Sequence, residues 1–135
     1  MTMAAKQTGA GVEPVSAPYW EAARAGRLLL QQCGQCGRIR HYPRVLCDVC
    51  FSFAVSWVES PGLGVIYSWT VAHHAFAPDV AGDVPYVLAT VDLAEGVRVL
   101  GRLSPGTDPG IGMDVRVRFA ASGDGPPMLL VQPID

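Results

Sequence analysis

The sequence predicts a mainly β fold made of a short N-terminal helix, a four-cysteine metal ribbon and a five-stranded Greek-key barrel of the OB type. Three observations indicate this fold. All four cysteines lie in two C-x-x-C pairs within residues 33–50. Glycine (15) and proline (11) make up about a fifth of the 135 residues, which favours turns over long helices. Short apolar runs separated by turn residues fill the C-terminal half, a pattern typical of small barrels.

The N-terminal part is expected to begin with a flexible lead or linker over residues 1–15, which are rich in Gly, Ala and Thr. The stretch SAPYWEAARAGRLLLQQ then predicts a helix followed by a strand. Ser16 is the expected N-cap, Pro18 lies in the first turn where its missing N–H costs little, and Gly26 is the expected stop. We expect residues 16–60 to hold the helix and the ribbon, and residues 61–135 to hold the barrel.

The short helix carries two large aromatic residues, Tyr19 and Trp20, which are expected to share one face with Ala23. Two interpretations stay open. The aromatic side chains either cover the core or dock into a neighbouring protein, since large aromatics are enriched where proteins bind each other.

The cysteines follow the spacing Cys33-x2-Cys36, ten residues, then Cys47-x2-Cys50. Each C-x-x-C can form a tight turn that points two sulfurs at one position, and four thiolates satisfy a tetrahedral Zn²⁺ ion. This spacing predicts a metal site.

The residues after the two pairs differ. Gly37 follows the first pair and can adopt a positive φ at little cost. Phe51 follows the second pair, so that turn must tolerate a residue other than glycine.

Structural zinc is the expected occupant. Iron in a rubredoxin-like site is the main alternative, because four thiolates suit both metals. Two disulfides are rare in a chain without a secretory signal, and a redox C-x-x-C normally occurs once, at the start of a helix. With all four positions filled by protein, no position is open to a substrate, and the metal would instead supply folding free energy.

After the second cysteine pair, FSFAVSWVES runs to the turn PGLG at 61–64. The segment DVRVRFA is the clearest strand, with Val115, Val117 and Phe119 facing one way. VIYSWTVA is apolar on both faces, which predicts a strand covered on each side. The five strands expected in the barrel are Val65–Ala72, Tyr86–Leu93, Val97–Leu103, Asp114–Ala120 and Met128–Gln132.

Charge and hydropathy exclude some function classes. Residues 1–60 carry six Lys/Arg against four Asp/Glu, or +2, whereas residues 61–135 carry four against eight, or −4. An acidic barrel argues against nucleic acid as the partner. No apolar run approaches the roughly 20 residues that span a bilayer, and the N-terminus lacks the apolar region of a signal peptide. We expect a cytoplasmic protein.

Two groups of polar residues are candidates for contacts. Adjacent residues on an extended segment point in opposite directions, so His73 and His74 cannot easily share one metal. They are either loop residues or polar contacts to a partner or ligand. Arg38, Arg40 and Arg44 are either ordinary solvated arginines or contacts to a phosphate or a carboxylate, whose geometry arginine matches well.

Taken together, these pieces resemble the acyl-CoA-associated OB-fold proteins with a rubredoxin-like zinc ribbon. The resemblance runs from about residue 16 to the C-terminus. It rests, in order, on PYWEAARAGRLLL, the ribbon CGQCGRIRHYPRVLCDVC, PY before a strand, the L-x-E-G-V-R turn at 93–98 and GMDVRVRF. Tyr42-Pro43 stands where many relatives have two prolines.

The resemblance implies an accessory role. Members are partners of thiolases and of the thiolase-like aldolases of sterol side-chain degradation, or are fused to hot-dog-fold enoyl-CoA hydratases. The reaction chemistry then belongs to the thiolase-fold subunit. The family's metal ligands carry over to Cys33, Cys36, Cys47 and Cys50, and no catalytic residue carries over.

We therefore expect a non-catalytic subunit or domain that binds a thiolase-fold partner and helps form the route of an acyl-CoA thioester. The chain is expected to be a domain of a longer hydratase-linked protein or a close stand-alone relative. Tyr19, Trp20, the three arginines and the two histidines are its candidate partner or CoA contacts.

Two other functions stay open. A single-stranded nucleic-acid binder would need a basic track with exposed rings, which Trp57, Tyr67, Trp69 and Phe76 could supply. A stand-alone enzyme acting on CoA esters would use His73 or His74. The sequence contains no G-x-S-x-G motif, P-loop or Rossmann fingerprint, so a binding module is favoured over an enzyme.

Overall fold

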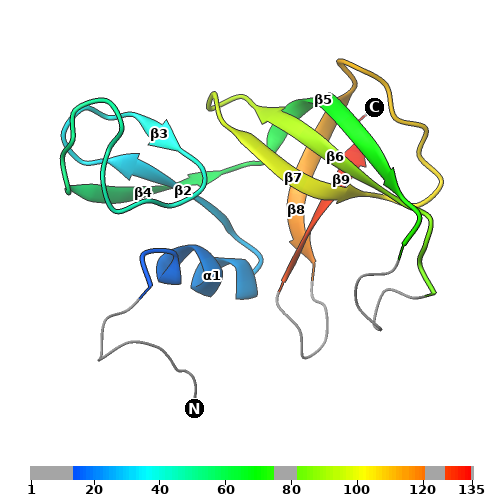
Figure 1. Ribbon diagram of the computed structural model, residues 1–135, viewed down its shortest axis with the longest axis horizontal. Coiled ribbons are helices and arrows are strands. Elements are labelled where there is room, and N and C mark those ends of the chain that lie inside the picture. Colours follow the sequence, from blue (N-terminus) through cyan, green and yellow to red (C-terminus); the bar gives the residue numbers. More distant parts are fainter. Residues whose placement is uncertain (1–13, 75–81, 121–126, 135) are drawn as a thin grey trace, which may run out of the picture.

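The computed structural model describes residues 14–74, 82–120 and 127–134. In these ranges the chain forms one helix, a three-stranded sheet and a closed five-stranded barrel (Figure 1). The helix and the small sheet lie at one end of the molecule and the barrel at the other. Most of the expected lead at 1–15, and the segment that contains Phe76, lie outside the described residues.

Helix α1 spans Ala17–Arg24. Ser16 is its N-cap as predicted, but the Ser16 side chain makes no capping hydrogen bond. At the other end Gly26 has φ of +79°. The N–H groups of Gly26 and Arg27 donate to carbonyl oxygens inside the helix at 2.9 and 2.8 Å. This pair of bonds is a Schellman motif, which ends the helix and turns the chain directly into the next strand.

One face of α1 is buried and consists of Tyr19, Ala22 and Ala23. The Tyr19 ring packs edge-on against the barrel residue Phe119, with ring centroids 5.7 Å apart. The prediction that Trp20 shares this face is wrong, since Trp20 is 36% exposed. Successive residues on a helix are rotated by about 100°, so Trp20 turns away from the core once Tyr19 points into it.

The ribbon sheet has β2 (Leu28–Cys33) at its centre, between β3 (Ile39–Arg40) and β4 (Val55–Ser60). Both neighbours run antiparallel to β2, and β4 pairs with it along its full length. Leu28 and Leu30 on β2 are buried in the same apolar cluster as the barrel interior. The strand therefore joins the core at one end and delivers Cys33 to the metal site at the other.

The barrel confirms the five predicted strands to within two residues at either end. The strand order is β5-β6-β7-β9-β8, closed by pairing of β5 with β8, and only β7 and β9 run parallel. This closed five-stranded arrangement is an OB-fold barrel. The strands are β5 (Leu63–Ala72), β6 (Tyr86–Leu93), β7 (Arg98–Leu103), β8 (Asp114–Ala120) and β9 (Met128–Pro133).

Side-chain alternation explains the barrel core. On β8, Val115, Val117 and Phe119 are buried while the residues between them are exposed, as the sequence predicts. Strand β5 departs from its prediction. Its residue Ile66 is buried, but Val65, Tyr67, Trp69 and Val71 are 37–49% exposed. The barrel interior covers one face of β5, and no second layer of the described chain covers the other face.

A two-residue connection, Pro61–Gly62, joins the ribbon to the barrel. The Gly62 N–H donates to the Ser60 hydroxyl oxygen at 3.0 Å, and the Val117 N–H donates to the Gly62 carbonyl at 2.8 Å. Gly62 has φ of +80°, and a Cβ at this position would overlap the Val117 carbonyl oxygen. Only glycine fits this connection, which lies directly against β8.

Among the described residues, no helix is both long and apolar enough to cross a membrane.

Candidate metal centre

The two C-x-x-C turns bring four sulfur atoms to one place. The Sγ atoms of Cys33 and Cys50 are 3.5 Å apart, those of Cys36 and Cys47 are 3.6 Å apart, and all four lie within 4.8 Å of one another. A tetrahedral ion with metal–sulfur bonds of about 2.3 Å separates its ligands by about 3.8 Å. The four cysteines, which are not joined in disulfides, therefore fit one tetrahedral metal ion.

The first knuckle (Cys33–Gly37) prepares its sulfur for ionisation. The backbone N–H groups of Gln35 and Cys36 each donate to the Cys33 Sγ at 3.4 Å. These bonds, that from Cys36 first and that from Gln35 second, lower the pKa of Cys33 from 9.0 to about 6. A thiolate is the form that binds metal, so the turn favours the ligand state.

The second knuckle (Cys47–Phe51) repeats this arrangement. The backbone N–H groups of Cys50 and Val49 lower the pKa of Cys47, and the Val49 nitrogen lies 3.4 Å from its sulfur. For Cys50, the backbone N–H of Ser52 acts in the same direction, but burial and the three neighbouring thiols outweigh it and raise the pKa to about 11. Four thiols this close cannot all ionise on their own, so a bound cation is needed to hold four thiolates.

The last residue of each knuckle has the same backbone conformation. The Gly37 N–H donates to the Cys33 carbonyl at 3.1 Å, and the Phe51 N–H donates to the Cys47 carbonyl at 3.1 Å. Gly37 has φ of +81°, and Phe51 has φ of +61°. A residue with a Cβ loses about 1–2 kcal/mol in this left-handed region, so Phe51 holds its position at a conformational cost that Gly37 does not bear.

Five exposed large apolar side chains lie in and beside the second knuckle, within residues 45–53. We call this set the apolar cluster; its most exposed members are Phe51 at 68% and Phe53 at 73%. The first knuckle, by contrast, exposes two glycines, Gln35 and Cys36. The members of the apolar cluster are Val45, Leu46, Val49, Phe51 and Phe53.

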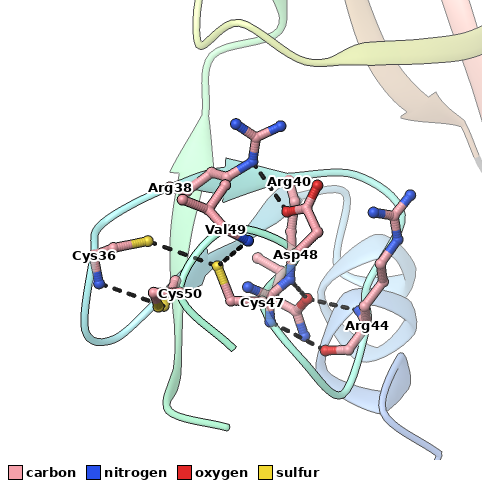
Figure 2. A network of polar contacts seen from close by, with 10 residues as sticks. Cys36, Arg38, Arg40, Arg44, Cys47, Asp48, Val49 and Cys50 are labelled. Atoms are coloured by element: carbon pink, nitrogen blue, oxygen red, sulfur yellow. Dashed lines mark hydrogen bonds and ion pairs between the residues drawn. The ribbon is translucent and has the colours of Figure 1, made fainter. Parts of the chain in front are cut away.

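The three candidate arginines lie in different settings (Figure 2). Arg38 pairs with Asp48 of the second knuckle at 3.3 Å, and both side chains are about half exposed. Arg40 is buried, because it lies opposite Gln31 on the central strand β2. Its Nε donates to the Gln31 Oε1 at 2.5 Å and its Nη2 to the Arg44 carbonyl at 3.1 Å. The exposed Arg44 guanidinium has no partner among the described residues. Arg40, in contrast, is buried, whereas a residue that contacts a partner directly would be exposed.

His41 is a notable residue that the sequence reasoning missed. Its ring packs against Tyr42 and Tyr19, with centroids 4.0 and 5.4 Å away. Neither ring nitrogen has a hydrogen-bond partner in the described part of the chain. Burial lowers the pKa of His41 from 6.5 to about 4, so the ring is neutral at pH 7. The local sequence HYP contains no signal of this burial.

An apolar groove of about 620 Å³ lies between α1 and the barrel. Tyr19 forms its buried floor next to Trp20, with ring centroids 5.0 Å apart, and burial raises the pKa of Tyr19 to about 12. Arg102 lies at the groove and stacks over the Tyr86 ring at 4.4 Å. The other principal lining residues are Leu88, Leu100, Phe119 and Met128. The structure thus brings the two predicted aromatics together at one hollow.

His73 and His74 follow the end of β5 directly, and both are exposed. They lie on the barrel, far along the chain from the cysteines. The next residues, 75–81, are outside the described ranges.

Two family models match adjacent parts of the chain. Residues 20–56 match the ChsH2 rubredoxin-like zinc ribbon domain, and residues 57–120 match the ChsH2 C-terminal OB-fold domain. The boundary between them falls within β4.

Three relatives are similar in sequence. A probable enoyl-CoA hydratase alpha subunit of Thermomonospora curvata is 44% identical over 85 residues, covering 63% of this chain and 26% of the relative. The 3-oxo-4,17-pregnadiene-20-carboxyl-CoA hydratase alpha subunit of Mycobacterium tuberculosis is 39% identical over 105 residues, covering 75% of this chain and 32% of the relative. A DUF35 domain-containing scaffold protein of Methanocaldococcus jannaschii is 31% identical over 91 residues, covering 65% of this chain and 64% of the relative. The chain thus spans between a quarter and a third of the two hydratase subunits.

A solved structure described as the Ltp2-ChsH2(DUF35) aldolase is similar over nearly the whole chain. Its TM-score is 0.79 at 34% sequence identity, and the match covers 93% of this chain and 98% of that one.

Proposed function

This chain belongs to the DUF35 family, with a ChsH2-type zinc ribbon followed by an OB-fold domain, and from that premise we propose that it is a non-catalytic accessory subunit or domain of a thiolase-fold enzyme. The enzyme is a thiolase or a sterol side-chain aldolase that acts on acyl-CoA thioesters. This chain binds it, supports its fold or activity and lines part of the substrate route.

One observation carries the proposal. The similar solved structure is described as an aldolase by two protein names joined together, Ltp2 and ChsH2(DUF35), and this chain matches 98% of its counterpart there at 34% identity. A relative described as a scaffold protein supports the same role. The two hydratase alpha subunits support a further link to a hot-dog-fold hydratase, in the same chain or the same complex.

The metal in this proposal is structural zinc, with iron as the less favoured ion. Support comes from the tetrahedral fit of the four sulfurs and from the match to a zinc ribbon model. Because protein fills all four positions, the ion would hold the two knuckles together and leave no position for a substrate. The ribbon contributes few buried apolar residues of its own, so the ion would supply much of its folding free energy.

The groove between α1 and the barrel is the proposed contribution to the acyl-CoA route. Its volume of about 620 Å³ lies within the range of small-molecule sites, and most of its lining is aromatic or aliphatic. Trp20 lies at the exposed edge, and Arg102, whose guanidinium pairs with Asp83 at 3.3 Å, is part of the lining. Apolar parts of an acyl thioester would pack in such a groove while the partner enzyme holds the reacting carbon.

Several other residues remain proposed contacts. Arg38 and Arg44 are exposed and would face a CoA phosphate or an acidic rim of the partner. His73 and His74, also exposed, would make polar contacts from the barrel. Arg40 would act only indirectly, by fixing the backbone that carries Arg44.

Co-expression tests the proposal. The tagged chain is produced together with Ltp2, the aldolase component named with the solved relative, and the mixture is separated by size exclusion. We expect one co-eluting complex, more soluble Ltp2 than without the chain, and aldol cleavage of an acyl-CoA substrate only when both are present. Soluble, fully active Ltp2 that elutes apart from this chain would refute the proposal.

The alternative function, binding of single-stranded nucleic acid, has less support. Two of the four barrel arginines are already occupied. Arg98 pairs with Asp92 at 2.6 Å and stacks over Tyr67 at 3.6 Å. Arg102 pairs with Asp83 at 3.3 Å. A basic track with free aromatic rings is what such binding requires. Salt-dependent binding of an oligonucleotide near neutral pH would revive this alternative.

A further inference from the structure

We propose that the apolar cluster in and beside the second knuckle is the surface by which this chain docks onto its thiolase-fold partner, on an apolar face of that partner bordered by a carboxylate that pairs with Arg44. This inference rests on the proposed function and names the docking surface that it leaves open.

The first step is that Phe51 is not explained by folding. Its backbone conformation is that of Gly37 in the first knuckle, with the same hydrogen bond back to a cysteine carbonyl at 3.1 Å. Glycine satisfies that geometry without strain, whereas a phenylalanine resists it. The strained residue also exposes 68% of its surface, so its ring gains little burial within the chain. Backbone strain that no packing within the chain offsets points to a function for the residue.

The second step is that the two knuckles differ in side chains at matched positions. Gln35 and Val49 occupy the same place, since each backbone nitrogen lies 3.4 Å from the first sulfur of its knuckle. Gln35 is polar and exposed, while Val49 is apolar and 55% exposed. The metal site therefore tolerates a polar residue here, and the apolar residue at the second knuckle is not required by the metal.

The third step concerns the concentration of exposed apolar residues. Five large apolar side chains fall within residues 45–53, each at least 39% exposed. Single exposed apolar residues are ordinary, but a group of them on one rigid segment is typical of protein–protein contact sites. The backbone N–H groups of Val49 and Phe51 are both bonded to Cys47, so docking through these two side chains would cost little backbone ordering entropy.

The charges at the edge of the cluster distinguish a different protein from a second copy of this chain. Arg44 directly precedes the cluster, and its exposed guanidinium lacks a partner in the described part of the chain. A symmetric dimer would bring the same surface of each copy together, with two unpaired Arg44 side chains at its edge. The nearby carboxylate of Asp48 is already paired with Arg38. A different protein that supplies a carboxylate resolves this charge, which favours the enzyme partner.

The experiment measures the affinity of the zinc-loaded chain for Ltp2 with four variants. Phe51→Gly removes the ring and relieves the backbone, so its melting temperature should equal or exceed that of the wild type while its dissociation constant rises about 30-fold or more. Val49→Ser should weaken binding about tenfold, and its matched control Gln35→Ser should stay within about twofold. Arg44→Gln should weaken binding about tenfold and reduce the dependence on salt.

Each other outcome overturns the inference in a distinguishable way. If the wild type itself does not bind Ltp2, the proposed function fails as well. If the wild type binds and Phe51→Gly binds equally tightly, only the docking surface is wrong. A Phe51→Gly chain that loses zinc or melts earlier would make Phe51 a folding residue. A concentration-dependent dimer of the chain alone, made monomeric by Phe51→Gly, would assign the surface to a second copy.

Discussion

The two knuckles share a backbone and differ in almost every side chain. Each places two N–H groups around its first cysteine sulfur and closes with a residue at positive φ. The first knuckle closes with Gly37 and the second with Phe51. The metal geometry therefore fixes the main chain of both turns, and it leaves the outward-facing side chains free to serve another purpose.

The difference teaches where folding ends and recognition begins in this ribbon. In both turns the hydrogen bonds to sulfur come from backbone N–H groups, which almost any residue type supplies. Exposed positions are polar or lack a side chain in the first turn, whereas the second turn exposes the apolar Val49 and Phe51 beside Asp48. Variants that treat the two turns symmetrically should thus affect folding alike, and variants that exchange their side chains should not.

The largest expected effect comes from removing one sulfur from each turn. Cys33→Ala and Cys47→Ala should each abolish metal binding and unfold the ribbon, because zinc binding by such sites contributes on the order of 10 kcal/mol. Elemental analysis should find one zinc per wild-type chain and none per variant, and circular dichroism should report the lost structure. A variant that keeps its metal would mean that the two turns are not equal partners.

The segment between the turns should give a pH-dependent effect. His41 has a folded pKa of about 4 against 6.5 for the free group. Above pH 6.5 the ring is neutral in both states, and below it the unfolded chain takes up about one proton that the folded chain refuses. The free energy of unfolding should therefore fall as the pH drops from 6.5 to 4.

Urea titrations across this range test His41 against a His41→Asn variant. Acid also protonates the cysteines and releases the metal, so the informative quantity is the difference between the two chains at each pH. That difference should change with pH by the uptake of about one proton. A difference that stays constant from pH 7 to 4 would contradict the assigned pKa.

A smaller effect is expected from exchanging the closing residues. Gly37→Ala should cost about 1–2 kcal/mol, and the cost is conformational, since the new Cβ would come no closer than 4.0 Å to the Gln32 side chain. Phe51→Gly should gain up to about 1 kcal/mol, because relief of strain exceeds the extra entropy of glycine in the unfolded chain. Chemical denaturation with zinc present measures both. Equal signs for the two variants would remove the contrast between the turns.

The smallest effect should come from the ion pair that links the turns. Arg38 and Asp48 are half exposed at 3.3 Å, and pairs of this kind contribute about 0–1 kcal/mol. Arg38→Gln should lower stability by no more than this, and the loss should shrink in high salt. A larger loss that persists in high salt would mean that Arg38 does more than pair with Asp48.

Features that depend on local sequence could be predicted well. The C-x-x-C spacing is enough to specify the metal cluster, because each turn is built from neighbouring residues. The alternation in DVRVRFA identified β8, and Gly26 identified the end of α1, since both signals lie within a few residues. The division at residues 16–60 and 61–135 into separate folding units stays a prediction.

Features that depend on distant residues could not be predicted. Arg40 is buried because β3 places it opposite Gln31, a pairing that the sequence does not reveal. Trp20 is exposed because Tyr19 is taken up by Phe119, a residue 100 positions away. The open face of β5 was expected to be covered, because an apolar strand does not say whether its cover comes from its own chain or from another. His41 was missed for the same reason as Arg40.

The tight connection at Pro61–Gly62 has a consequence for engineering. Gly62 has no room for a Cβ and is hydrogen-bonded to both Ser60 of the preceding strand and Val117 of β8. The connection therefore holds the ribbon and the barrel in one relative orientation. A partner that binds the ribbon therefore also sets the orientation of the barrel. Chimeras that graft the ribbon of one relative onto the barrel of another should keep this relative orientation only when the connecting glycine and the facing β8 backbone come from the same parent.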